Sequence, residues 1–75
     1  MSFSETINAQ FDVARTVRRL RMDLTFEEMA RRLEVTTRTI YRYANRETRP
    51  EEMIRLRLFD LASEHGKLVH VVETL

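Results

Sequence analysis

Side chains that can bind anions are concentrated in one stretch of the sequence. Residues 34–49 hold four arginines, four threonines and two tyrosines within sixteen positions. An arginine guanidinium is planar and can bind two phosphate oxygens, or the O6 and N7 atoms of guanine, at the same time. The stretch is therefore suited to recognising an anionic partner through bidentate hydrogen bonds.

The charge of the chain is unevenly distributed. The formal net charge is only +1, but twelve of the thirteen basic residues are arginines that lie between Arg15 and Arg57, a span that carries about +5. The first fourteen and the last eighteen residues carry about −2 each. A basic centre indicates a localised anionic partner. The same composition would result if the arginines only formed solvent-exposed faces of helices.

The length of the chain limits its core. Seventy-five residues predict one domain spanning 1–75, and a domain of this size buries only about 60–65% of the surface that its unfolded chain exposes. The sequence has no cysteine, so neither a disulfide nor a thiolate metal site can add stability. A partner subunit is the remaining stabiliser, and we expect one.

The sequence offers no sign of a membrane segment or of catalysis. No apolar run approaches the roughly 20 residues of a membrane span, and the first ten residues do not resemble a signal peptide, so we expect a cytoplasmic protein. His65 and His70 lack a carboxylate or thiol at metal-ligand spacing. There is no serine and histidine constellation and no glycine-rich phosphate loop. We therefore expect no enzyme activity, no metal and no cofactor.

Apolar residues recur at helical spacing, and the chain has one glycine and one proline. Four helices are expected: a long one capped by Ser4 that includes Phe11 and ends near Met22, one from Phe26 to Leu33, one from Thr37 to about Asn45, and one with Pro50 at its first position and Gly66 as its left-handed C-cap.

Two of these helix starts have specific signals. Thr25 followed three residues later by Glu28 is a capping box, in which each side chain binds a free backbone N–H group. Thr36 is a good N-cap for the third helix. The tail at residues 67–75 is apolar and β-branched, and it is the one place where the sequence favours a short strand.

Two short helices joined by a three-residue turn must cross steeply, which requires a small residue at the crossing and apolar residues in the angle. Ala30 is the small residue. The residues that fill the angle are Met29, Leu33, Val35, Ile40 and Tyr43.

With these residues in place, the stretch "LTFEEMARRLEVTTRTIYRYANRETRP" resembles the helix-turn-helix regulators of the lambda repressor and Cro class. The resemblance extends from about Leu20 to Leu61. It implies an all-α fold, a compact four- or five-helix bundle that contains a helix-turn-helix, with a possible short C-terminal strand. Glu34 occupies the turn position that is usually glycine, so either Glu34 is strained in a left-handed conformation or the turn differs in detail. Phe26 stands where the family often has a phosphate-binding glutamine.

The third helix has a polar face that fits the major groove of DNA. At 100° per residue, Arg38, Arg42 and Asn45 lie almost opposite its apolar residues, with Tyr41 at the edge of that polar face. Arginine can bind guanine and asparagine can bind adenine in that groove. The candidate base contacts are Thr37, Arg38, Tyr41, Arg42 and Asn45. The candidate phosphate contacts are Thr25, Arg31, Arg32, Thr36, Arg46 and Arg49, of which Arg31 and Arg32 are explained equally well as a solvated helix face.

These residues predict a sequence-specific DNA-binding transcriptional regulator, in the first place a homodimeric repressor that binds a palindromic operator in double-stranded DNA. Residues 67–75 are the expected dimerisation tail, although they could also pack over the helices of their own chain. A phage Cro-like protein, a restriction–modification controller and an anti-CRISPR-associated autorepressor all resemble the chain in size. It has no room for a ligand-sensing domain, so no small-molecule ligand is expected.

A second hypothesis is a protein-interaction module, such as an antitoxin or inhibitor built on a helix-turn-helix scaffold. The polar face argues against it, because a protein hot spot would favour Trp, Tyr or Leu over Arg and Asn.

Overall fold

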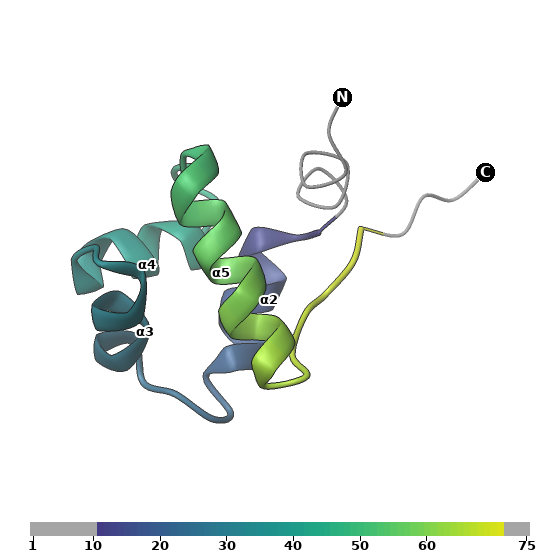
Figure 1. Cartoon of the computed structure of the whole chain (residues 1–75). Coiled ribbons are helices and arrows are strands. Elements are labelled where there is room, and N and C mark those ends of the chain that lie inside the picture. Colours follow the sequence, from purple (N-terminus) through teal and green to yellow (C-terminus); the bar gives the residue numbers. More distant parts are fainter. Residues whose placement is uncertain (1–10, 72–75) are drawn as a thin grey trace.

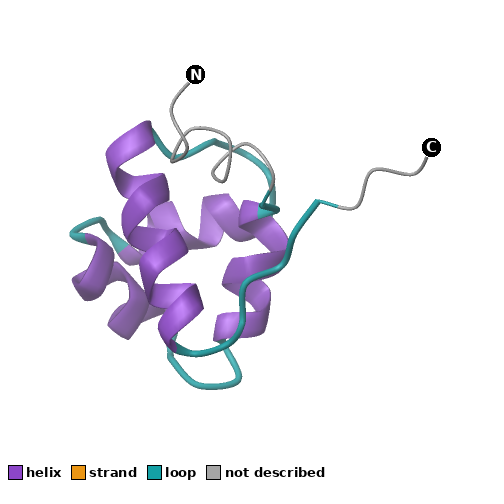
Figure 2. Ribbon diagram, turned by 45° about the vertical axis from the view of Figure 1, so that its right-hand side comes forward, coloured by secondary structure: helices purple, strands orange, loops and turns teal. Residues whose placement is uncertain are grey.

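The computed structural model describes residues 11–71, and these form a bundle of four helices. They are α2 (Val13–Leu20), α3 (Phe26–Leu33), α4 (Thr37–Ala44) and α5 (Glu52–Glu64) (Figure 1). α4 and α5 each pack against both α2 and α3. Figure 2 shows only helices and loops in this part of the chain, so the all-α prediction is confirmed. Within residues 11–71, no helix is long and apolar enough to cross a bilayer.

The capping residues predicted for α3 and α4 start those helices. The Thr25 hydroxyl accepts a hydrogen bond from the Glu28 amide at 3.1 Å, and the Glu28 carboxylate accepts one from the Thr25 amide at 3.1 Å. The Thr36 hydroxyl accepts from the Thr39 amide at 3.2 Å. Local sequence therefore sets both helix starts.

The first and last predicted helices begin later than expected. The Asp12 carboxylate accepts a hydrogen bond from the Arg15 amide at 3.1 Å, so α2 begins at Val13 and Phe11 precedes it. Ser4, its predicted cap, lies outside the described residues. Pro50 is not the first residue of α5, because Glu51 is still extended (φ −67°, ψ 166°) and acts as the N-cap.

The helices α3, α4 and α5 end in the same hydrogen-bond pattern, with a left-handed residue after each: Glu34 (φ 58°), Arg46 (φ 59°) and Gly66 (φ 63°). The next amide donates to the carbonyl oxygen five residues earlier, at 2.9 Å in each case: Val35 to Ala30, Glu47 to Arg42, and Lys67 to Ala62. This is the Schellman motif, in which glycine is usual. Glu34 is thus left-handed, and a residue with a Cβ atom in that conformation costs about 1 kcal/mol.

All four helices contribute to one hydrophobic core. The residues predicted to fill the crossing of α3 and α4 lie in it or against it: Met29, Leu33, Val35, Ile40 and Tyr43. Ala30 is buried at the same place. Leu20 from α2 and Leu58 from α5 are fully buried in the same cluster. The core therefore fixes α4 with its apolar side inward.

The described part of the C-terminal tail returns to the start of the same chain. The Asp12 amide donates to the Val69 carbonyl at 2.7 Å, and the Val69 amide donates to the buried Thr16 hydroxyl at 3.1 Å. Phe11 and His70 form a single antiparallel bridge. Strand pairing cannot extend along Asp12 because α2 begins at the next residue. Among residues 11–71 the predicted strand is thus reduced to one bridge, and residues 72–75 of the predicted dimerisation tail lie outside the description.

Candidate nucleic-acid interface

The polar face of α4 points away from the core, as predicted. Its five candidate base contacts are all exposed: Thr37, Arg38, Tyr41, Arg42 and Asn45. On the other side of the helix Ile40, Tyr43 and Ala44 are buried. None of the ion pairs formed among residues 11–71 involves Arg38 or Arg42. Two guanidinium groups are therefore presented to solvent on one face of the helix.

An aromatic contact fixes the edge of this face. The Phe26 and Tyr41 rings meet edge to face, with centroids 6.5 Å apart and an interplanar angle of 73°. The guanidinium carbon of Arg21 lies 4.7 Å from the centroid of the Phe26 ring, which is a cation–π distance. Phe26 thus holds Tyr41 beside the polar face and brings Arg21 near it. Sequence reasoning did not single out Arg21, although the unusual aromatic residue at position 26 was visible.

The N-termini of α3 and α4 have opposite electrostatic character. The first turn of α4 has no acidic residue, so its free amides and positive helix dipole are available to a phosphate near Thr36. The first turn of α3 contains Glu27 and Glu28. Hydrogen bonds from the Thr25 amide and then from its hydroxyl lower the pKa of Glu28, which keeps that carboxylate ionised. Both cap hydroxyls are engaged within their own helix, Thr25 with Glu28 and Thr36 with Thr39. Only Thr25 lies beside a carboxylate, so the geometry supports a phosphate at the helix start near Thr36 and gives Thr25 no support.

The four arginines predicted to contact phosphate lie in different surroundings. Arg31 is exposed and forms no ion pair with any residue of the described range. Arg32 pairs with Glu64 at 3.0 Å, and both side chains are more than half exposed. Arg46 pairs with Asp12 at 3.1 Å. The exposed pair of Arg32 and Glu64 contributes about 0–1 kcal/mol, so a phosphate can replace Glu64 there. In the second pair the Arg46 side chain is exposed and Asp12 is not.

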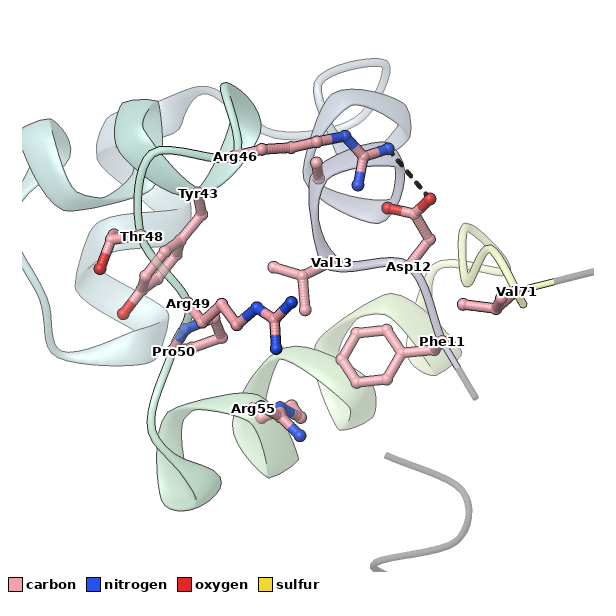
Figure 3. A pocket seen from close by; sticks show the side chains of 11 residues that line it. Phe11, Asp12, Val13, Tyr43, Arg46, Thr48, Arg49, Pro50, Arg55 and Val71 are labelled. Atoms are coloured by element: carbon pink, nitrogen blue, oxygen red, sulfur yellow. Dashed lines mark hydrogen bonds and ion pairs between the residues drawn. The ribbon is translucent and has the colours of Figure 1, made fainter. Parts of the chain in front are cut away.

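Arg49 lines a cavity of about 480 Å³ between α2, α5 and the loop that joins α4 to α5. In Figure 3 its guanidinium points into this space, which we call the arginine cavity because Arg46, Arg49 and Arg55 all line it. Arg55 on α5 is half-buried and lines the cavity together with Phe11, which precedes α2. Arg57, two residues further along α5, pairs with Glu34 at 3.1 Å.

Comparison with protein-family models, with curated proteins and with solved structures finds no match to this chain.

Proposed function

We propose that the chain is a sequence-specific DNA-binding regulator that uses α3, the turn 34–36 and α4 as a helix-turn-helix. The observation that carries the proposal is the exposed face of α4, where Arg38, Arg42 and Asn45 lie opposite buried apolar residues. One helix fits the major groove of B-DNA, and these three side chains match the hydrogen-bonding edges of guanine and adenine. Such a protein represses transcription when its operator overlaps a promoter.

Phosphate contacts on both sides of the groove would set the position of α4. The amides at the N-terminus of α4, with the Thr36 side chain beside them, supply one contact. Arg31 on α3 supplies a second, and Arg46 after the end of α4 supplies a third once it leaves Asp12. These contacts carry affinity and orientation, and the face of α4 carries the sequence preference.

The proposal includes a homodimer that binds a palindrome in a prokaryotic cell or a phage-infected host. One recognition helix reads only a few base pairs, and two helices about 34 Å apart read two half-sites on one side of the duplex. That arrangement gives the affinity that an operator requires.

Selection of bound sequences from random double-stranded DNA tests the proposal. We expect enrichment of a palindrome. The logarithm of the association constant for this palindrome should fall linearly as the logarithm of the salt concentration rises. The enriched palindrome, an isolated half-site and a scrambled duplex should then be compared at one salt concentration. Recovery of no preferred sequence, with equal affinity for all three duplexes, would refute sequence-specific binding.

One observation favours the alternative of a protein partner. Tyr41 is 57% exposed and packs against Phe26, and Met22 is 75% exposed and lines a surface pocket together with Phe26. Tyrosine is enriched in protein hot spots. A partner protein bound through this apolar surface would show little salt dependence, in contrast to DNA.

A further inference from the structure

The arginine cavity is formed by segments that are distant in the sequence. Phe11 comes from the segment before α2, Tyr43 from the last turn of α4, Arg49 and Pro50 from the loop after α4, and Arg55 from α5 (Figure 3). Its volume of about 480 Å³ lies within the range of small-molecule sites, which is about 300–1,000 Å³. No sequence motif predicts this cavity, because its residues come together only when the helices pack.

The lining of the cavity combines positive charge with apolar walls. Three arginines and one acid, Asp12, line it, and Asp12 is bound by Arg46. Arg49 and Arg55 form no ion pair within residues 11–71. Figure 3 shows the Arg49 guanidinium pointing toward the Phe11 ring, with Arg55 beneath it. Two guanidinium groups without an ion pair in this range thus line a space whose walls also include the Phe11 and Tyr43 rings and Pro50.

Arg55 also has a buried donor without an acceptor. The Nε atom of Arg55 is inaccessible to solvent and has no hydrogen-bond partner, and it is the one side-chain atom in that situation among the described residues. A buried donor without a partner is destabilising, and more so when the group is charged. A ligand in the cavity cannot reach this inaccessible atom, but an anionic oxygen there would interact favourably with the charge of Arg55 and could accept charge-assisted hydrogen bonds from the other nitrogen atoms of its guanidinium.

We propose that the arginine cavity binds a small organic anion, with a carboxylate or phosphate group held by Arg49 and Arg55 and an apolar body against Phe11 and Pro50. Both oxyanions fit the forked donors of a guanidinium. The apolar walls favour an anion that carries a hydrophobic or aromatic group over a bare inorganic ion.

The site would also control DNA binding, a consequence that rests on the proposed function. Arg49 and Thr48 line the cavity and belong to the loop that leaves α4. An anion that holds Arg49 inward removes it from the surface where it was predicted to contact a DNA phosphate. Each ligand would then weaken the binding of the other by the same factor.

Binding of the anion is tested first, without DNA, by titrating the ¹⁵N-labelled full chain with phenyl phosphate and with benzoate. We expect saturable amide shifts at residues 11–13, at residues 47–49 and at Glu51, and the tighter of the two probes identifies the preferred oxyanion. Benzyl alcohol and inorganic phosphate serve as the uncharged and the bare-ion controls. The absence of saturable shifts at about 10 mM probe, where even a ligand with a Kd near 1 mM would be bound, would overturn the proposal. Equally tight binding of benzyl alcohol would overturn the role of the negative charge. Equally tight binding of inorganic phosphate would overturn the role of the apolar walls.

Matched variants assign the site. Arg49→Gln and Arg55→Gln should each weaken the binding of the preferred probe at least tenfold, while Arg57→Gln, two residues further along α5 and paired with Glu34, should leave it unchanged. Arg49 is exposed, so its variant remains informative if Arg55→Gln fails to fold. Unchanged affinity in the folded Arg49→Gln variant would place the anion elsewhere.

The effect on DNA is measured separately with the selected duplex. We expect a saturating concentration of the preferred probe to weaken DNA binding about fivefold or more, the lower end of typical allosteric coupling, and to have no effect on Arg49→Gln. Anion binding without this effect would refute the coupling and leave the site intact. Anion binding by a chain that selects no DNA sequence would refute the proposed function alone.

Discussion

The Asp12 carboxylate accepts a hydrogen bond from the Arg46 guanidinium at 3.1 Å and thereby joins the residue before α2 to the left-handed residue after α4. The same carboxylate caps α2 through the Arg15 amide. The Asp12 side chain is 16% exposed and the Arg46 side chain is 59% exposed. The acid is therefore fixed by the fold, and the arginine is the partner that can leave for a phosphate.

Asp12 should make the stability of the domain depend on pH in the acid range. Partial burial raises the pKa of Asp12, but the Arg15 amide and the Arg46 guanidinium outweigh that effect and hold it below the ordinary value of 3.8. Because the pKa is lower in the folded state than in the unfolded state, the ionised group stabilises the fold above pH 3.8, and this contribution is lost as the pH falls through the folded pKa.

Asp12→Asn keeps a capping side chain and removes the charge, so we expect it to lower stability at neutral pH by about 0.5–1 kcal/mol. Thermal unfolding followed from pH 7 down to about pH 2 should show the two proteins converging at the acid end, since protonated aspartate and asparagine carry the same charge. Asp60→Asn, at an exposed position on α5, is the control and should show no such convergence. A constant difference at every pH would mean that the charge of Asp12 does not act on stability.

The left-handed conformation of Glu34 predicts that glycine is better there than alanine. Both substitutions remove the exposed ion pair with Arg57, so the difference between them isolates the effect of the Cβ atom. We expect Glu34→Gly to be more stable than Glu34→Ala by about 1 kcal/mol in urea unfolding. Equal stability of the two variants would show that the turn can adopt another conformation without cost.

The signals that were read correctly from the sequence are local. The helix starts are determined by Thr25, Glu28 and Thr36 through hydrogen bonds that span three residues. The end of α5 is determined locally too, by the left-handed conformation of Gly66. The orientation of α4 was also predictable, because the apolar spacing of Ile40, Tyr43 and Ala44 decides which face is buried.

The relationships that were missed depend on packing between distant residues. Arg46 and Asp12 are 34 residues apart, and Arg32 and Glu64 are 32 residues apart, so no spacing rule connects them. Helical periodicity within α5 likewise does not show that Arg55 lines a cavity with Phe11, which precedes α2. Arg46 adopts a left-handed conformation although it is not a glycine, so its residue type did not indicate this conformation.

The base contacts of α4 should be separable from the scaffold. Arg38→Ala and Arg42→Ala remove exposed guanidinium groups that have no ion pair within residues 11–71, so circular dichroism should show unchanged helix content. Each should weaken binding to the selected palindrome by about 1–3 kcal/mol and relax the preference at one base pair. Arg18→Ala, on the exposed side of α2, is the matched control. An equal loss on selected and scrambled duplexes would assign these arginines to phosphate contacts.

The hydrogen bond between Thr16 and Val69 should anchor the tail to α2. Thr16 is fully buried and accepts the Val69 amide at 3.1 Å, so Thr16→Val, which keeps the volume and removes the acceptor, leaves that amide without a partner. We expect a loss of about 1–3 kcal/mol in stability and faster hydrogen exchange at Val69. Thr16→Ser retains the hydroxyl and should keep the Val69 amide protected, although it loses a methyl group from the core. An unchanged exchange rate at Val69 in Thr16→Val would show that another contact holds the tail.

Sedimentation of the same two variants tests the proposed dimer. If the tail joins two subunits from its docked position, the Thr16→Val dimer should dissociate more readily than the Thr16→Ser dimer.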